Sequence, residues 1–470
     1  MQHFEAAGGA GQRSVERMVG ELGRLLGPCG LVTDRDLLER YSCDWTYANA
    51  CPPVAVARPR STAEVAAVLA HCHAAGWPVV VQGGLTGLAG GATPRAGELA
   101  VSLERLAGIE SLDADAAAMT VRAGTRLAAV HQAAGEVHLA FPLDLASRGS
   151  CTIGGNIATN AGGNRVIRHG MTRNLVLGIE AVLADGTVLS SLTTMLKDNA
   201  GYDLKQLFIG TEGTLGIVTR AVLRLQPEPL ERITALVALG SFADLTRLLV
   251  TLRRDLASSL SSFEAMWSDY FECALERLAL ARPFGAAHPF YALVEIEALD
   301  PAVDRGRLEA VLFRVLEAGA ASDAVVASSL DDAARLWRIR EGAGELITGL
   351  APAAAYDVSM PLAAMEAYVA GVRAGFEALG IGRPFGAFGH LGDGNLHLFA
   401  GVNSREETAT IDALVYGALQ GRGSVSAEHG IGSLKKSWLG HTRSPAEIVV
   451  MRSLKQHLDP RGILNPGRVL

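Results

Sequence analysis

One stretch of fifteen small and amide side chains, residues 149–163, constrains the fold of this chain more than any other segment. Its sequence, GSCTIGGNIATNAGG, holds too little apolar surface to pack a core by itself. Loops of this length are usually functional. Small residues let a flat ring system lie against the backbone, and the Asn and Thr side chains offer it hydrogen bonds. We therefore predict that the segment lines a binding site for a planar ligand.

Two further glycine-rich segments have the same character. QGGLTGL (82–88) follows the apolar run Pro78–Val81, and GTEGTLGIVT (210–219) precedes a predicted strand. Glycine permits positive φ and close backbone approach, so successive N–H groups converge on an anion. A pyrophosphate is the natural occupant of residues 82–88. Because the spacing is not G-x-G-x-x-G, a nicotinamide-binding Rossmann site is disfavoured.

Length, charge and composition exclude several classes of protein. A length of 470 residues favours two or more domains, and a net charge of −7 argues against a nucleic-acid binder. Apolar runs such as Ile233–Leu239 fall short of the roughly 20 residues of a membrane span. Met1–Arg13 lacks the apolar core of a signal peptide, so we expect a cytoplasmic protein. The six cysteines form no CxxC or CxxCH motif, which predicts reduced thiols and an external acceptor for any electrons.

Proline and element patterns divide the chain. The QPEP sequence at 226–229 interrupts both helix and strand and marks a boundary. We predict an α+β protein with four parts: a helical segment (1–50), an α/β region (51–227), a cap (228–430) and a C-terminal segment (431–470). Within 51–227 we expect a strand and helix over Thr120–Gly135 and a hairpin over Gly178–Ser190. In the cap, the expected elements are a strand Ile233–Leu239, a helix to about Ala257, a strand Phe290–Glu297 and a helix to about Gly319.

Two histidine-containing segments carry the chemistry. GHLGDGNLH (389–397) predicts a strand, a glycine turn and a second strand. This hairpin could bring His390 and His397 close together at the opening of one site. SVSAEHGIG (424–432) adds Glu428 and His429 in a glycine-framed loop. A single histidine is more often structural, but two imidazoles and a carboxylate form a common catalytic zinc set with an open position. A remaining group can then act as a base.

In order and spacing, the three glycine-rich segments resemble the FAD-binding domain of the vanillyl-alcohol-oxidase/PCMH flavoprotein superfamily. The rest of the chain is similar to the type-4 C-terminal domain of that superfamily. The resemblance implies a PCMH-type FAD-binding domain of two α/β subdomains. It also implies a cap with an antiparallel sheet and a C-terminal helical segment returning to the flavin. Some members tether FAD through a His after the paired glycines, where this chain has Leu85 and Thr86; we expect non-covalent FAD.

The resemblance also implies which residues contact FAD. Residues 82–88 would hold the pyrophosphate, and the other two segments would line the adenosine and the flavin. The residues so implied are Gln82, Gly83, Gly84, Leu85, Thr86, Gly87, Leu88, Gly149, Ser150, Thr152, Gly155, Asn156, Thr159, Asn160, Gly162, Gly216, Ile217, Val218 and Asn465.

The histidine segments resemble the HxGDGNxH and EHGxG signatures of FAD-linked D-lactate, D-2-hydroxyglutarate and glycolate dehydrogenases. Carried over, His390, His397 and Glu428 would bind a divalent metal, Zn²⁺ or else Mn²⁺, Co²⁺ or Fe²⁺. His429 would take the proton of the substrate hydroxyl while a hydride leaves C2 for the flavin. The implied product is a 2-oxo acid.

Substrate choice rests on a few positions. LWRIRE (336–341) resembles the segment with a substrate-binding arginine, which implies Arg340, with Tyr356 and Phe399 as further contacts. The 2-hydroxyglutarate branch carries Lys, Thr and Asn where this chain has Ala355, Gly344 and Phe399. Without these partners a second carboxylate is poorly compensated. We therefore expect D-lactate or a larger apolar monocarboxylate.

Other readings stay open. A D-2-hydroxyglutarate dehydrogenase and a glycolate oxidase flavin subunit are alternatives within enzymes, as is a metal-free carbohydrate or phenol oxidase. A non-catalytic flavin-binding subunit is an alternative of another class, although retention of His390, His397, Glu428 and His429 counts against it. The acceptor is open among an electron-transfer flavoprotein, a quinone and a cytochrome, and a homodimer would be unsurprising.

Overall fold

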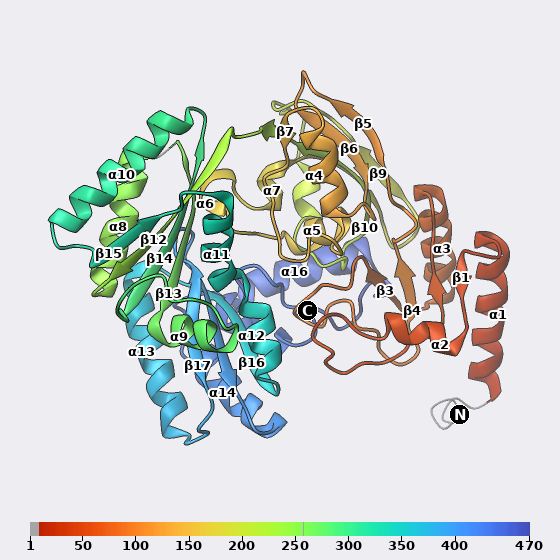
Figure 1. The fold of residues 1–470 in the computed structure, drawn as a ribbon. Coiled ribbons are helices and arrows are strands. Elements are labelled where there is room, and N and C mark those ends of the chain that lie inside the picture. Colours follow the sequence, from red (N-terminus) through yellow and green to blue (C-terminus); the bar gives the residue numbers. More distant parts are fainter. Residues whose placement is uncertain (1–8, 257) are drawn as a thin grey trace.

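The computed structural model describes residues 9–256 and 258–470. An N-terminal region (residues 9–227) and a cap region (residues 228–430) lie side by side as two lobes (Figure 1). The N-terminal region begins with α1 (Gly9–Leu26), β1 (Leu31–Val32), α2 (Arg35–Leu38) and the 3-10 helix η1 (Glu39–Tyr41). The segment predicted to be helical therefore also supplies a strand, and its first eight residues lie outside the described part.

The first sheet presents the end of a strand to the first glycine-rich segment. Its order is β1-β2-β4-β3, with β2 (Val56–Ala57), β3 (Val79–Gln82) and β4 (Leu99–Ser102) parallel. Helix α3 (Thr62–Ala75) begins after Ser61, whose hydroxyl accepts the Glu64 N–H, and ends at Gly76 with φ of 66°. Residues 83–88 leave β3 at its carboxyl end.

The second sheet is antiparallel, in the order β5-β6-β10-β8-β9. Its strands are β5 (Ile109–Asp113), β6 (Ala118–Arg122), β8 (Val176–Val182), β9 (Val188–Ser191) and β10 (Ile217–Arg224). Both the predicted β8–β9 hairpin and the strand β6 followed by α4 (Leu127–Gly135) are confirmed. The region also contains β7 (Leu139–Ala140), α5 (Ile153–Thr159), α6 (Val166–His169), α7 (Thr172–Leu175), η2 (Leu204–Leu207) and β11 (Gln226–Pro227), which pairs with β7.

Part of the long small-residue segment is helical, which differs from the predicted loop. Thr152 caps α5 by accepting the Gly155 N–H, and the helix ends at Asn160 with φ of 50°. Gly154 packs against Ala123, where a Cβ would lie 2.8 Å from the Ala123 side chain. The small residues thus let α5 approach the sheet closely, and they leave the rest of the segment as open loop.

The cap region is built on a seven-stranded antiparallel sheet, in the order β15-β12-β14-β13-β17-β18-β16. Its strands are β12 (Glu231–Leu239), β13 (Leu260–Trp267), β14 (Phe290–Ala298), β15 (Asp323–Val326), β16 (Ala353–Ser359), β17 (Phe385–His390) and β18 (Asn395–Gly401). The predicted antiparallel sheet backed by helices is confirmed. The first predicted helix ends at Asp255, and Ala257 lies outside the described residues.

Helices cover both faces of this sheet. One face packs on α8 (Phe242–Asp255), α10 (Pro301–Glu317), α13 (Leu362–Ala378) and α14 (Arg405–Gly417). The other packs on α9 (Ser268–Arg277), α11 (Leu330–Glu341) and α12 (Ala343–Gly349). The second face is the one that continues into the candidate site.

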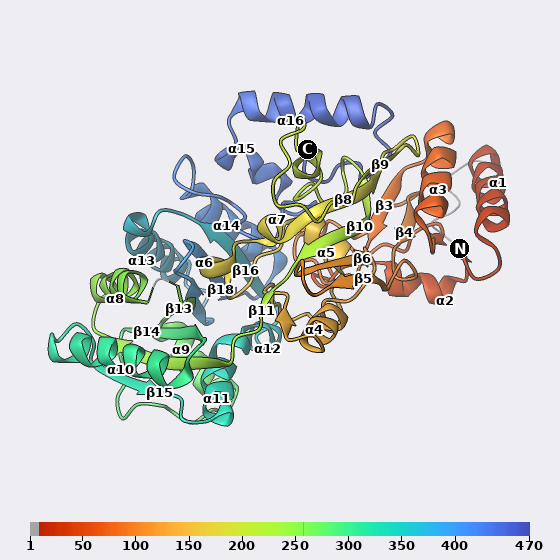
Figure 2. The same cartoon turned by 90° about the horizontal axis from the view of Figure 1, so that it is seen from above.

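The C-terminal residues return to the N-terminal region. After η3 (Lys436–Trp438), α15 (Leu439–Thr442) and α16 (Pro445–Leu458), residues 463–465 join the first sheet. Leu464 bridges Val79 of β3, and Leu464 and Ile463 lie in the core beneath that sheet. Figure 2 shows α16 lying along the N-terminal region. None of the described helices has both the length and the apolar character needed to cross a membrane.

Candidate active site

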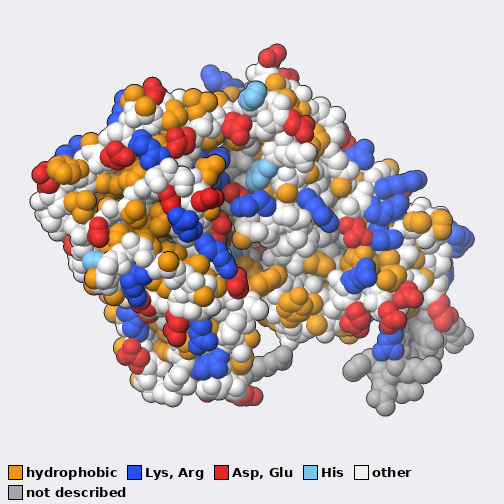
Figure 3. Space-filling model, in the orientation of Figure 1, with side chains coloured by type: hydrophobic (Ala, Val, Ile, Leu, Met, Phe, Trp, Pro, Cys, Tyr) orange, Lys and Arg blue, Asp and Glu red, His pale blue; other side chains and the backbone are white. Residues whose placement is uncertain are grey.

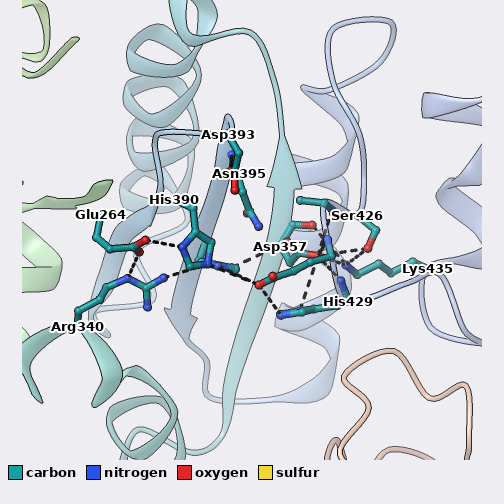
Figure 4. Close-up of polar contacts among 12 residues, drawn as sticks. Glu264, Arg340, Asp357, His390, Asp393, Asn395, Ser426, His429 and Lys435 are labelled. Carbon is teal, nitrogen blue, oxygen red and sulfur yellow. Dashed lines mark hydrogen bonds and ion pairs between the residues drawn. The ribbon is translucent and has the colours of Figure 1, made fainter. Parts of the chain in front are cut away.

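The cap sheet gathers four titratable side chains on one face. Glu264 of β13 pairs with His390 of β17, and His397 of β18 pairs with Asp357 of β16. Directly paired residues of antiparallel strands point to the same face of the sheet. The imidazole centroids of His390 and His397 are 5.3 Å apart, so the predicted meeting of these two residues is confirmed. Figure 4 shows Glu264 beside His390 and Arg340.

Three imidazoles surround one oxygen of Glu428. The Oε1 atom lies 3.8 Å from His390 Nε2, 3.5 Å from His397 Nε2 and 3.6 Å from His429 Nε2. These separations exceed normal hydrogen bonds. They match the ligand–ligand spacing of about 3.4 Å around a tetrahedral cation with bonds of about 2.1 Å. Among the described residues, one ligand atom each from Asp357, His397, Glu428 and His429 lies within 4.8 Å of the others, a group that does not include His390. A set of imidazoles and carboxylates is of the chemical type that binds divalent metals.

Asp357 holds the loop that carries Glu428 and His429. We call residues 426–432 the base loop. The Asp357 carboxylate is fully buried and lies 3.6 Å from Lys435 Nζ. Its Oδ2 atom accepts hydrogen bonds of 2.9–3.2 Å from the backbone N–H groups of Ala427, Glu428 and His429 and from the Ser426 hydroxyl. A single charged oxygen therefore fixes three successive amides of the base loop.

Glu264 orients two members of the site from the opposite side. Its Oε1 accepts the Nδ1–H of His390 at 2.7 Å, and its Oε2 accepts the Nε–H of Arg340 at 2.7 Å. The first bond leaves His390 Nε2 facing Glu428, the arrangement usual for a ligating histidine with a carboxylate behind it. The second holds Arg340 above the Phe388 ring, 4.6 Å from its centroid.

The charges around Glu428 separate the two histidine pKa values. Burial lowers the pKa of His390, but the Glu264 and Glu428 carboxylates outweigh this and raise it to about 10. Burial lowers the pKa of His397 to about 3 despite the nearby Glu428. Burial raises the pKa of Glu428, yet His390 and His397 hold it at about 2. Glu428 is therefore ionised at neutral pH.

Tyr356 and Phe399, two predicted substrate contacts, lie on opposite faces of the cap sheet. Tyr356 points to the other face of the sheet, where its hydroxyl donates to Asp412 at 2.8 Å and its ring packs on Tyr416. Tyr356 therefore lies on the face away from His397, because neighbouring residues of a strand face opposite ways; its contact with substrate stays a prediction. Phe399 shares the face of His397, fully buried against Tyr270.

Numbered along the chain, the glycine-rich segments are 82–88 (first), 149–163 (second) and 210–219 (third). The first and the second are in contact, as their small residues suggest. A Cβ on Gly84 would lie 2.1 Å from the Ser150 carbonyl oxygen, and one on Gly83 would lie 2.5 Å from Thr152 Oγ1. Leu85 has φ of 56°. Among the described residues the backbone N–H groups of Gly84, Leu85 and Thr86 have no hydrogen-bond partner. A Cβ at either glycine would fill the space beside these unpaired N–H groups. The space and the N–H donors together fit an anionic group such as a pyrophosphate.

The other predicted cofactor residues divide into two groups. Gln82 Oε1 and Asn156 Nδ2 are buried without a hydrogen-bond partner, which is consistent with a missing polar ligand. Others already have structural roles: Thr159 and Asn160 bond within the segment and to Arg173, and the Ile217 and Val218 side chains lie in hydrophobic cores. Gly87 and Leu88 are half-buried in the first segment, and Gly149 and Ser150 are exposed. Gly155 follows the Thr152 cap, and Gly216 packs on Phe208.

The second glycine-rich segment (149–163) also lies close to Glu428 of the His and Glu cluster. A Cβ on Gly162 would lie 3.1 Å from Glu428 Oε2. The predicted cofactor segment and the predicted metal set, far apart in sequence, are thus direct neighbours. In the space-filling view a hollow with Lys and Arg side chains along its edge lies between the two regions (Figure 3).

Sequence reasoning missed Glu264 and Asp357. Glu264 lies in a strand that is buried along its whole length, and Asp357 lies in a run of three buried residues in β16. Charged residues are seldom fully buried unless paired, so a lone acid in an apolar strand is the signal that was available. Lys435, the buried partner of Asp357, follows the base loop and carried no such signal.

Comparisons with known proteins agree with this arrangement. Residues 53–191 match the family described as "FAD binding domain", and residues 228–469 match "FAD linked oxidases, C-terminal domain". The chain is 43% identical to a D-2-hydroxyglutarate dehydrogenase of Xanthomonas citri, over 93% of this chain and 94% of that protein. It is 40% identical to the mitochondrial D-2-hydroxyglutarate dehydrogenase of Bos taurus, over 94% of this chain and 81% of that protein.

Solved structures extend the likeness to the fold. A p-cresol methylhydroxylase structure with bound substrate superposes with a TM-score of 0.77 at 17% identity, covering 97% of both chains. An alkyldihydroxyacetonephosphate synthase superposes with a TM-score of 0.75 at 17% identity, covering 96% of this chain and 85% of that one. The predicted PCMH-type fold is thereby confirmed.

Proposed function

We propose that this chain, which belongs to the FAD-linked oxidase family, oxidises a D-2-hydroxy acid to the 2-oxo acid. The observation that carries the proposal is the close approach of Gly162 to Glu428, where a Cβ on Gly162 would lie 3.1 Å from Glu428 Oε2, so that the FAD-binding segment and the His and Glu cluster are neighbours. The sequence relatives named D-2-hydroxyglutarate dehydrogenases support the reaction class. Bound FAD would supply the acceptor for the two electrons that leave C2. An external acceptor would then reoxidise it.

The FAD site is proposed to be non-covalent. The first glycine-rich segment offers backbone N–H groups of Gly84, Leu85 and Thr86 for the pyrophosphate. The residues that follow the paired glycines are Leu85 and Thr86. Neither side chain can form the covalent bond to the flavin that a histidine forms in some members of the superfamily. The cradle is therefore one of backbone contacts and small side chains.

His390, His397 and Glu428 are proposed to hold a divalent metal, with zinc the best match to two imidazoles and a carboxylate. A metal there would supply Lewis-acid polarisation of the substrate hydroxyl and lower its pKa. The support is the spacing of the proposed ligand atoms, with His390 Nε2 at 3.8 Å and His397 Nε2 at 3.5 Å from Glu428 Oε1. Glu264 behind His390 fixes the ring with Nε2 toward the site.

Arg340 and His429 act directly on the substrate in this proposal. The Arg340 Nη1 atom makes no hydrogen bond within the described chain, so it remains available for the substrate carboxylate. His429 accepts the hydroxyl proton at Nε2, the ring nitrogen on the Glu428 side. Its Nδ1 lies 3.8 Å from Asp357 Oδ2, and this buried carboxylate stabilises the imidazolium that results.

The substrate is proposed to be a monocarboxylate, D-lactate or a larger apolar acid. Ala355 and Phe399 are cross-strand partners on the sheet face of Asp357 and His397, one step further along. Their side chains offer no charge or hydrogen bond to a second carboxylate. Arg340 and Lys435 are the cations bonded to the cluster in the described residues, and each already faces a buried acid.

Anaerobic flavin bleaching by the purified chain tests the function. Single D- and L-2-hydroxy acids are added with and without a chelator, and the flavin absorbance is followed. We expect bleaching by a D enantiomer, faster with D-lactate or a longer apolar acid than with D-2-hydroxyglutarate, and loss of bleaching after chelation. Preference for D-2-hydroxyglutarate would refute the monocarboxylate assignment, and no bleaching by any hydroxy acid would refute the reaction.

A double substitution tests the substrate assignment from the other side. Ala355→Lys with Phe399→Asn introduces a cation and an amide beside His397. A charge-assisted hydrogen bond contributes about 1.5–3 kcal/mol, so kcat/KM for D-2-hydroxyglutarate relative to D-lactate should rise about tenfold or more. Steady-state kinetics with both substrates measure the ratio. The Ala354→Ser variant, whose position faces the other side of β16, serves as the control.

A further inference from the structure

A second carboxylate holds the base loop from the side opposite to Asp357. Glu212, in the third glycine-rich segment, accepts the backbone N–H of Ile431 at 2.7 Å and that of Gly432 at 2.9 Å, one on each oxygen. Between the two sets of bonds lies Gly430, with φ of 85°. A Cβ at Gly430 would lie 2.8 Å from Glu212 Oε1, so the loop and the carboxylate fit closely.

Glu212 is itself fixed by several parts of the N-terminal region. Its N–H donates to the Ala158 carbonyl of α5 at 2.8 Å, and its carbonyl accepts from Asn465 Nδ2 at 2.5 Å. The Asn465 Oδ1 atom in turn accepts the Val81 N–H of β3 at 2.8 Å. Glu212 therefore links the strand before the first glycine-rich segment, the helix of the second and the C-terminal residues.

The base loop is thus held by two acids from different regions. Asp357 of the cap binds the amides of residues 427–429, and Glu212 of the N-terminal region binds those of residues 431–432. His429 is the last residue of the first group. Its imidazole is placed relative to the cap by Asp357 and relative to the FAD-binding segments by Glu212.

We propose that Glu212 is a positioning residue for His429, setting the distance between the base and the FAD-binding segments. The inference rests on the proposed function and deepens it. A carboxylate is needed here because both oxygens face N–H donors. A glutamine would place its NH2 group against one of the two backbone N–H donors, so one of the two hydrogen bonds to Ile431 and Gly432 would be lost.

The test compares Glu212→Gln with the wild-type holoenzyme by anaerobic stopped-flow reduction of the flavin over a range of substrate concentrations. Misplacement of a reacting group by about 1 Å costs on the order of 10²-fold in rate. We expect the limiting reduction rate per bound FAD to fall about 10- to 100-fold, with the substrate Kd within about threefold because Arg340 is untouched. Hydrogen exchange at the amides of residues 431–432 should accelerate.

A milder variant keeps the test independent of folding. Gly91→Ala places a Cβ 3.0 Å from Glu212 Oε2 and 3.7 Å from the Gly432 Cα, so it presses on the carboxylate. It should lower the limiting rate in the same direction. Gly135→Ala, at an open helical position, is its control.

Glu98→Gln controls for loss of a buried acid, since Glu98 pairs with Arg468 and does not contact the base loop. It should lower the melting temperature without changing the rate per bound FAD. If Glu212→Gln and Gly91→Ala likewise change stability alone, Glu212 has only a structural role. Wild-type flavin that no hydroxy acid reduces would instead overturn the proposed function, a result distinguishable from this one.

Discussion

Replacement of His429 by alanine should slow flavin reduction by about 10²- to 10⁴-fold, the usual contribution of a general base. The backbone of residue 429 keeps its bond to Asp357, because the amide and not the imidazole is the donor. The base loop should therefore keep its conformation and FAD should stay bound. Single-turnover reduction by the best D-2-hydroxy acid, normalised to FAD absorbance, measures the effect.

His441→Ala is a matched control for this substitution. His441 follows the base loop, packs on Trp438 at a centroid distance of 5.0 Å and makes no contact with Glu428 in the described structure. Its loss should leave the reduction rate within about twofold of wild type. A normal rate in His429→Ala would show that another group takes the hydroxyl proton.

On the proposed function, replacement of Glu428 by glutamine should prevent binding of the proposed metal and remove most of the activity. The substitution deletes the anion at the centre of three imidazoles, and metal polarisation contributes several kcal/mol, which corresponds to about 10²- to 10⁴-fold in rate. Metal content by emission spectroscopy and flavin reduction should fall together. Circular dichroism should remain unchanged, since the Glu428 amide stays bound to Asp357.

An exposed acid provides the comparison for Glu428. Glu345 forms an ion pair with Arg338 at the surface of α12, and its side chain is 64% exposed. Glu345→Gln removes the same charge and should leave metal content and rate unchanged. Full activity of metal-free Glu428→Gln would reject the metal and favour a purely protein-based site.

Local patterns predicted the parts of the site that lie close together in sequence. The spacing of GHLGDGNLH was sufficient to predict the β17–β18 hairpin and the meeting of His390 with His397, because a glycine turn between short strands leaves few alternatives. The glycine-rich segments indicated close backbone contacts, which Gly83 and Gly84 make with the second segment.

The choice between Tyr356 and Asp357 shows where local reasoning fails. The two are neighbours in one strand, and only the pairing partner decides which of them faces His397. Alternate residues of β16 point to opposite faces of the sheet. A shift of the strand pairing by one position would therefore exchange the faces of Tyr356 and Asp357. The sequence contains no signal for that register, so it did not indicate that Asp357 is the residue that faces His397.

Glu264 and Glu212 were out of reach for a different reason. Their partners lie 76 to 220 positions away, at Arg340, His390, Ile431 and Gly432. Such contacts depend on sheet order and on how the two regions pack, which no periodicity in one segment encodes. What the sequence does offer is their chemical type: an acid among apolar or glycine residues needs a partner from elsewhere.

The return of the C-terminal residues to the first sheet has a consequence for biosynthesis. Ile463 and Leu464 belong to the core of the N-terminal region, and Asn465 bonds to both Val79 and Val81 of β3. Strand β3 is therefore bonded to residues that are synthesised much later, with 384 positions between Val81 and Asn465. This part of the N-terminal region can be completed only after residue 465 has left the ribosome, whereas the cap sheet, whose strands all lie within residues 231–401, can form earlier during translation.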